Sequence, residues 1–216
     1  MTVLETIRLT CPVCGTDVVS TKALTTPRSV RKRTDFHECA PGTPSLPYLV
    51  HMCFRCGYAG KEEEFTTDAV TIAVRQHVWE ELAPNAFQWA QTGSAKYEAA
   101  ARIAIWQGAE ARSVGDLFLR AAWCCVDEGD IEAERYFRRL AAWEYQGSLE
   151  SHDSVARDDR AVLTFLVGEL WRRIGDERLA REWFSRVGDE LTNRSAQRWI
   201  VDAARQQRDD PREWFA

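Results

Sequence analysis

The sequence has no long hydrophobic run and no excess of positive charge. No window reaches the roughly 18 consecutive apolar residues that a membrane-spanning helix needs, so we expect no membrane partner. The first eleven residues lack a basic start followed by an apolar stretch, so no secretion signal is visible and we expect a cytoplasmic protein. The net charge is −5, and residues 67–216 hold 20 Lys and Arg against 26 Asp and Glu, an acidic excess that disfavours broad nucleic-acid binding by this part.

The seven cysteines do not fit a disulfide framework. Their number is odd, and the thiols of a cytoplasmic protein are kept reduced. Short segments rich in Thr, Val and Pro fill residues 1–66, and strands this short are not stable by themselves. Another interaction must therefore hold the N-terminal part together.

Four of the cysteines fall in two matching motifs, CPVCG and CFRCG, with 38 residues between the two Cys pairs. In Cys-x-x-Cys-Gly both sulfurs can point at one ion, because the glycine accepts the left-handed backbone that closes the turn. Two such knuckles supply four thiolates in a tetrahedron, a closed arrangement that suits structural Zn²⁺. The sequence therefore predicts Cys11, Cys14, Cys53 and Cys56 as zinc ligands, and iron in the same cage remains an alternative.

The expected secondary structure changes near Thr67. Before it, the pattern predicts strands over 17–24, 29–34 and 48–52; after it, apolar residues recur at helical spacing. The fold class is therefore mostly helical α+β, with a zinc-ribbon-like domain over 1–66 and a tetratricopeptide-like helical repeat domain over 67–216. The helices are expected at 67–82, 95–108, 114–128, 130–145, 155–174, 177–187 and 194–207, with a loop over 146–154. The expected N-caps are Ser94, Ser113 and Ser154, and the expected helix stops or turns are Gly108, Gly129 and Gly175.

Residues 163–187 carry the spacing of a tetratricopeptide repeat. Small residues stand at Gly168 and Ala180, large ones at Trp171 and Phe184, and Gly175 makes the turn. A looser copy has the small or turn residues Ala122, Cys125, Gly129 and Ala133 followed by the large Phe137, which makes Cys124 and Cys125 buried helix residues.

On this repeat frame, one set of side chains faces the concave side of the helices. They are Phe165, Glu169, Arg172 and Arg173. Such surfaces commonly hold peptides, and a pair of arginines can clamp a carboxylate. We therefore predict a peptide-binding groove here, with the alternative that these residues pack on neighbouring helices.

The segment RKRTDFHEC between the knuckles is the densest group of reactive side chains. Arg33, Asp35, His37 and Cys39 form a candidate polar site, near Tyr48 and His51 in sequence. Cys39 with His37 could form a nucleophile and base, which would make the protein a thiol-based enzyme or redox sensor. A second alternative is a nucleic-acid patch built from Arg28, Arg31, Lys32 and Arg33, and the simplest is a solvated strand.

The order of these motifs resembles a known family. CPVCG, RKRTDFHEC, CFRCGYAG followed by Phe65, and LVGELWRRIGDERLAREWFSRV together resemble the uncharacterised bacterial domain-of-unknown-function family 2225, over about residues 8–207. The resemblance implies a zinc-knuckle region with a tetratricopeptide-like tail, the four cysteines as ligands, and importance for Arg33 and Asp35. It implies no activity.

The pattern as a whole favours a non-enzymatic adaptor. A zinc-stapled ribbon would carry a helical platform that binds a protein or peptide, because repeat surfaces are extended and the helical half shows no catalytic constellation. The thiol enzyme or sensor and the nucleic-acid-binding ribbon are the competing hypotheses. The sequence indicates neither an oligomeric state nor a particular partner.

Overall fold

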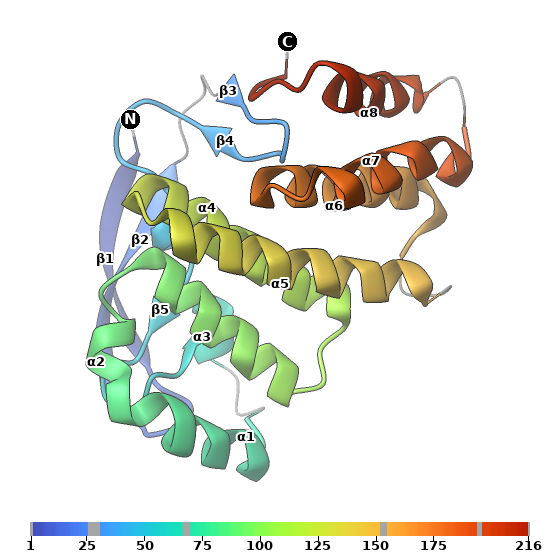
Figure 1. The fold of residues 1–216 in the computed structure, drawn as a ribbon. Coiled ribbons are helices and arrows are strands. Elements are labelled where there is room, and N and C mark those ends of the chain that lie inside the picture. Colours follow the sequence, from blue (N-terminus) through green and yellow to red (C-terminus); the bar gives the residue numbers. More distant parts are fainter. Residues whose placement is uncertain (1, 26–30, 67–69, 152–154, 194–195, 216) are drawn as a thin grey trace.

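The N-terminal part of the chain forms three antiparallel pairs of strands. In the computed structural model, which describes residues 2–25, 31–66, 70–151, 155–193 and 196–215, these pairs lie along one side of a stack of helices (Figure 1). The paired strands are β1 (Val3–Thr10) with β2 (Asp17–Thr25), β3 (Arg31–Lys32) with β4 (Glu38–Cys39), and β5 (His51–Met52) with β6 (Ala59–Gly60).

The β1–β2 hairpin is the longest of the three, and its alternating side chains explain how it is placed. Leu9 pairs with Val18, and both side chains are buried, whereas Arg8 and its partner Val19 point to solvent. The sequence analysis predicted β2 but missed β1. It also placed a strand over 48–52, where the structure has a 3-10 turn (Leu46–Tyr48) before the two-residue strand β5.

Helices make up most of the rest of the described chain. They are α1 (Ile72–His77), the π-helical η3 (Val78–Leu82), α2 (Ala86–Trp89), α3 (Gly93–Trp106), α4 (Ala111–Glu128), α5 (Ile131–Glu150), α6 (Arg160–Ile174), α7 (Glu177–Arg186) and α8 (Arg198–Asp209). Single 3-10 turns cover Glu62–Phe65, Ala83–Asn85, Arg157–Asp159 and Val187–Glu190. The structure therefore confirms a mostly helical α+β fold with small N-terminal hairpins.

Several predicted helix ends differ from the structure. Helix α5 continues to Glu150, so the loop expected from residue 146 is wrong for its first five positions. Thr92 caps α3 through its side-chain oxygen and Glu110 precedes α4, so Ser94 and Ser113 lie inside helices instead of capping them. The predicted cap Ser154 lies outside the described residues, as do the first positions of the helices expected from 67 and 194.

The predicted turn glycines are confirmed. Gly108, Gly129 and Gly175 have φ angles of 71°, 76° and 98°, and the last two end α4 and α6. Each occupies the left-handed region that favours glycine, so the helices stop where the sequence places these residues.

Successive helices from α3 to α7 each pack on the next, and α8 packs on α7 and α6 (Figure 1). One continuous cluster of buried apolar side chains runs from the strands through these helices, and it includes Cys124 and Cys125. The division into domains at residue 66 stays a prediction, as does the repeat character of the helices. No helix in the described ranges combines the length and apolar character needed to cross a membrane.

Gly168 allows α6 and α7 to approach closely, which gives a test of this packing. A Cβ added at Gly168 would lie 2.7 Å from Cδ1 of Phe184, whereas one added at Gly147 on the exposed face of α5 meets nothing within 4 Å. We expect Gly168→Ala to lower the free energy of unfolding by about 1–2 kcal/mol through overpacking. Gly147→Ala, the matched control, should raise it by up to about 1 kcal/mol.

Chemical denaturation followed by circular dichroism measures both changes. Equal effects of the two substitutions would contradict the close approach of α6 and α7 at Gly168.

Candidate metal centre and buried charge cluster

The two Cys-x-x-Cys turns meet at the N-terminal end of the helical stack. The first lies between β1 and β2 and the second between β5 and β6. All four predicted sulfur atoms lie within 4.8 Å of one another, and Cys11, Cys53 and Cys56 are at most 1% exposed. Sγ of Cys11 is 3.6 Å from Sγ of Cys56, and the same distance separates the sulfurs of Cys14 and Cys53.

These distances fit a metal ion. Zn–S bonds of about 2.3 Å in a regular tetrahedron place the sulfurs about 3.8 Å apart, close to the two contacts of 3.6 Å. Contact with Cys53 raises the pKa of the Cys11 thiol, and contact with Cys11 lowers the pKa of the Cys53 thiol. Four thiolates this close repel one another, so all four can ionise together only around a cation. The cluster could hold a metal ion.

Both knuckle glycines adopt the predicted left-handed backbone, with φ of 67° at Gly15 and 79° at Gly57. The Gly15 amide donates to the Cys11 carbonyl at 2.9 Å, and the Gly57 amide donates to the Cys53 carbonyl at 2.8 Å. A side chain at Gly57 would also meet Leu82, because its Cβ would lie 2.7 Å from the Leu82 Cβ.

Helix α1 and the following π-helical turn contact the two knuckles, one by a hydrogen bond and the other by packing. Nη1 of Arg75 on α1 donates to the carbonyl of Val13 in the first knuckle at 2.9 Å. Leu82 in η3 packs on the second knuckle at Gly57. The helical part thus positions a site whose sulfur atoms all come from the strand region.

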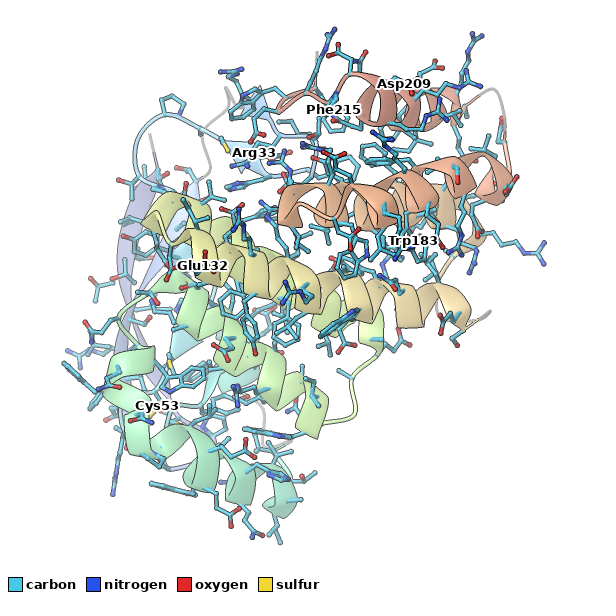
Figure 2. The ribbon with its side chains drawn as sticks, viewed as in Figure 1. Arg33, Cys53, Glu132, Trp183, Asp209 and Phe215 are labelled. Atoms are coloured by element: carbon cyan, nitrogen blue, oxygen red, sulfur yellow. The ribbon has the colours of Figure 1, made fainter. Side chains whose placement is uncertain are left out.

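A second cluster lies far from the sulfurs. In Figure 2, Cys53 lies beside α2 in the lower part of the molecule, whereas Arg33 and Phe215 lie in the upper part, near the C-terminal end of α6. The centre of this cluster is Asp35, which is 0% exposed. Nη1 of the fully buried Arg138 on α5 donates to Oδ2 of Asp35 at 2.7 Å, and Nε1 of Trp123 on α4 donates to the same oxygen at 3.2 Å.

Two more arginines complete the surroundings of Asp35. Nε of Arg173 lies 3.7 Å from its Oδ2, and Nε of Arg33 lies 3.9 Å from its Oδ1. Burial by itself raises the pKa of Asp35, but the positive charges of Arg138, Arg173 and Arg33 outweigh it. The net pKa lies well below its usual range, so Asp35 is a carboxylate at any physiological pH.

Glu169 on α6 organises the neighbouring half of the cluster. Its fully buried carboxylate accepts hydrogen bonds from Arg172 and Arg173. It also accepts a hydrogen bond of 2.6 Å from the hydroxyl of Thr34. The Thr34 hydroxyl in turn accepts from Nη2 of Arg173 at 2.9 Å. These contacts tie the segment between the knuckles to the last turn of α6.

The C-terminal tail closes the cluster. The amide of Thr34 donates to the Glu213 carbonyl at 3.1 Å, and the Phe215 amide donates to the Lys32 carbonyl at 3.0 Å, so the tail lies beside β3 (Figure 1). Nη1 of Arg173 donates to the Glu213 carboxylate at 2.9 Å. The ring of Phe36 stacks on Phe215 with 5.5 Å between centroids.

The central residues of the predicted peptide groove are covered in the structure, and its role in peptide binding stays a prediction. Phe165 and Glu169 are 0% exposed, because Phe36 and Thr34 of the chain's own segment cover them. Arg172 and Arg173 do clamp a carboxylate, as the sequence analysis expected of an arginine pair, but that carboxylate is Glu169.

The structure brings His37 and Cys39 together but does not activate the thiol. Sγ of Cys39 lies 3.6 Å from Nδ1 of His37, whose ring stacks on Trp123. Burial raises the pKa of Cys39, and the nearby charge of Arg33 does not offset it. Burial also lowers the pKa of His37 to about 4, so the imidazole is neutral at pH 7.

Tyr48 and His51 lie elsewhere. They line a cavity of about 630 Å³ between the strands and helices α3 and α4, whereas His37 and Cys39 line a separate one of about 270 Å³. His51 is buried, with Nδ1 2.9 Å from Oγ of Ser20 on β2. Its role is therefore to join β5 to β2.

Arg31 and Lys32 of the expected basic patch are exposed, whereas Arg33 packs against the buried Asp35. Arg33 is largely buried beside Asp35, and the guanidinium of Arg31 lies 4.1 Å from the ring centre of Trp214. Nζ of Lys32 lies 5.1 Å from the ring centre of Phe36, and Arg28 lies outside the described residues.

The partners of this charge cluster on the helices and the tail were not predicted from the sequence. Arg138 and Trp123 hold Asp35, and Glu213 holds Arg173, yet none of the three was a candidate. One signal was available: Arg138 follows Phe137 and precedes Ala141 on the buried face of α5, a place where a charged side chain needs a buried partner.

Comparison with known proteins identifies a family that spans most of the chain. The model of a family described as "Uncharacterized protein conserved in bacteria (DUF2225)" matches residues 4–210. Neither a curated protein nor a solved structure matches the chain.

The four-sulfur cluster predicts one metal ion per chain. We expect Cys53→Ser to abolish metal retention and to destabilise the strand region, because the ion's binding energy contributes to folding. Cys39→Ser is the matched control, since its sulfur lies outside the cluster. Native mass spectrometry weighs the ion directly. A chain without metal and four protons short in mass would contradict the site.

The buried imidazole of His37 predicts a pH dependence. The unfolded chain takes up a proton near pH 6.5, whereas folded His37 takes one up only near pH 4. The unfolded state therefore binds more protons between these values, and stability falls as pH falls through this window, by up to about 3 kcal/mol.

We expect His37→Gln to flatten this slope in urea denaturation at a series of pH values. His77→Gln, at a more exposed histidine on α1, is the control and should leave it unchanged. The same slope in both variants would rule out His37 as its source.

Proposed function

The chain belongs to the uncharacterised bacterial family DUF2225, and from its own residues we propose that it is a non-enzymatic, zinc-stapled adaptor. Its helical half binds an acidic segment of another protein or peptide. We place it in the cytoplasm, where thiols are kept reduced for metal binding.

Zinc in a structural role is supported by the sulfur cluster. Four cysteines form a closed ligand set with no position left for a substrate, and three of them are almost completely buried. The strand pairs are too short to be stable alone, so the ion would supply folding energy.

We propose that α4–α5 and α6–α7 are two tetratricopeptide-like units. Gly129 and Gly175 make corresponding turns, and Gly168 approaches Phe184 as the repeat spacing requires. Such units present extended helical surfaces to partners.

The observation that carries the adaptor function is a stripe on the exposed face of α5, which crosses the middle of the molecule (Figure 1). The stripe consists of Arg135, Tyr136, Arg139 and Trp143, which recur at helical spacing. Tyr136 is 47% exposed and Trp143 is 54% exposed. Aromatic residues and arginine are the residues that dominate binding energy at protein interfaces.

The charge of the stripe indicates the chemistry of the partner. Residues 67–216 are acidic as a whole, and on this face Arg135 pairs with Glu132 at 3.7 Å, whereas Arg139 adds positive charge beside the two aromatic rings. A complementary surface would carry carboxylates around an apolar centre.

A thiol-based enzyme or redox sensor is the second candidate, because Cys39 and His37 lie 3.6 Å apart. The raised pKa of Cys39 is opposite to the direction that such a site needs. Alkylation of Cys39 by iodoacetamide faster than that of a free thiol at pH 7 would favour this candidate over the adaptor. A nucleic-acid ribbon has less support, since Arg33 is buried beside Asp35.

The α5 stripe predicts which substitutions release a partner. We expect Arg139→Glu with Trp143→Ala to reduce recovery of a specific protein at least about tenfold, through loss of an aromatic anchor and of charge complementarity. Trp199→Ala on α8 is the matched control, because Trp199 is 49% exposed but lies outside the stripe.

The measurement is quantitative mass spectrometry of proteins recovered with the tagged chain from its own host, followed by titration of the recovered protein against both purified variants. Equal binding by the stripe variant and the control would refute the proposed surface.

A further inference from the structure

The buried charge cluster has the make-up of a peptide-recognition site. Residues 33–37 occupy a groove whose contacts come from α4, α5, α6 and the tail, and in this segment an acidic side chain is followed directly by an aromatic one. The carboxylate of Asp35 meets donors from Arg138 and Trp123, and the ring of Phe36 lies between Phe165 and Phe215. The backbone of Thr34 pairs with the tail as an added strand would.

The charges of the groove require an anion at the position of Asp35. The four arginines Arg33, Arg138, Arg172 and Arg173 face the four carboxylates Asp35, Glu134, Glu169 and Glu213. Removing Asp35 leaves one of these positive charges buried without compensation, which is unfavourable. Only another carboxylate can replace that of Asp35 without a large loss of free energy.

Two observations show that the chain's own segment fits the groove imperfectly. Nη2 of the fully buried Arg138 and Nε of Arg33 have no hydrogen-bond partner among the described residues. Phe36 has a φ of 68°, in the left-handed region, and no other non-glycine residue of the described chain has a positive φ. An unsatisfied buried donor and a strained residue both cost free energy.

We propose that this groove recognises an acidic residue followed by an aromatic one, that residues 33–37 fill it within the chain, and that a partner segment carrying the same pair displaces them. This inference goes beyond the adaptor function and uses a different surface from the α5 stripe. The internal segment acts as a tethered competitor. An external segment therefore has a lower affinity for the intact chain than for a chain whose groove has been emptied.

The probe for the first experiment is a fluorescent peptide with the sequence of residues 31–38, RKRTDFHE. The protein is the full chain with Asp35→Ala and Phe36→Ala, which removes the internal occupant. We expect fluorescence anisotropy to show binding to this variant that is at least about tenfold tighter than binding to the wild-type chain.

Two altered peptides separate recognition from general charge attraction. A peptide with Asn at the position of Asp35 should bind at least about 30-fold more weakly, because the buried arginine loses its partner. A peptide with Gln at the position of the exposed Glu38 loses the same charge and should bind nearly as well as the parent. Equal losses for the two peptides, or no binding of the parent peptide to a folded variant, would overturn the proposal.

Hydrogen exchange on the wild-type chain decides the question if the double variant does not fold. Excess parent peptide should speed exchange of the amides of residues 33–37, and the peptide with Asn should not. Unchanged exchange at millimolar parent peptide would show that the segment is a fixed part of the fold. Binding at the α5 stripe can persist in that case, so the two proposals fail independently.

Discussion

The ion pair between Asp35 and Arg138 is the interaction on which the arrangement of the rest depends. Both side chains are fully buried, so each needs the other to offset its loss of hydration. Asp35 lies between the two knuckles in sequence, and Arg138 lies in the middle of α5. Their contact therefore fixes the strand region onto the helices, and Trp123 and Arg173 hold the same carboxylate from α4 and α6.

The sulfur cluster and the charge cluster stabilise different regions of the N-terminal part. The sulfurs join the β1–β2 and β5–β6 turns at one end, under Arg75 and Leu82. The charge cluster fastens the segment between the knuckles to α5, α6 and the tail at the other end. A segment of 38 residues between the two Cys pairs is thus anchored at its ends by sulfur and in its middle by charge.

Sequence patterns found some of these features and could have found others. The repeated Cys-x-x-Cys-Gly located the metal centre, because sulfur spacing and the glycine turn are local properties, and Gly15 and Gly57 adopt the predicted backbone. The alternation of Ile7 and Leu9 with Thr6 and Arg8 carried the signal for β1, although it was missed. The partner of Asp35 had no such signal, since Arg138 follows it by 103 residues.

The sequence by itself determined the helical periods, the turn glycines, the sulfur site and membership of the family, because each depends on residues close together in the chain or on the order of motifs. Only the tertiary structure decided that Phe165 and Glu169 are covered by the chain's own segment, and that the tail lies beside β3. These contacts join residues up to 183 positions apart, as between Lys32 and Phe215, and a buried charge takes whichever opposite charge the packing brings to it.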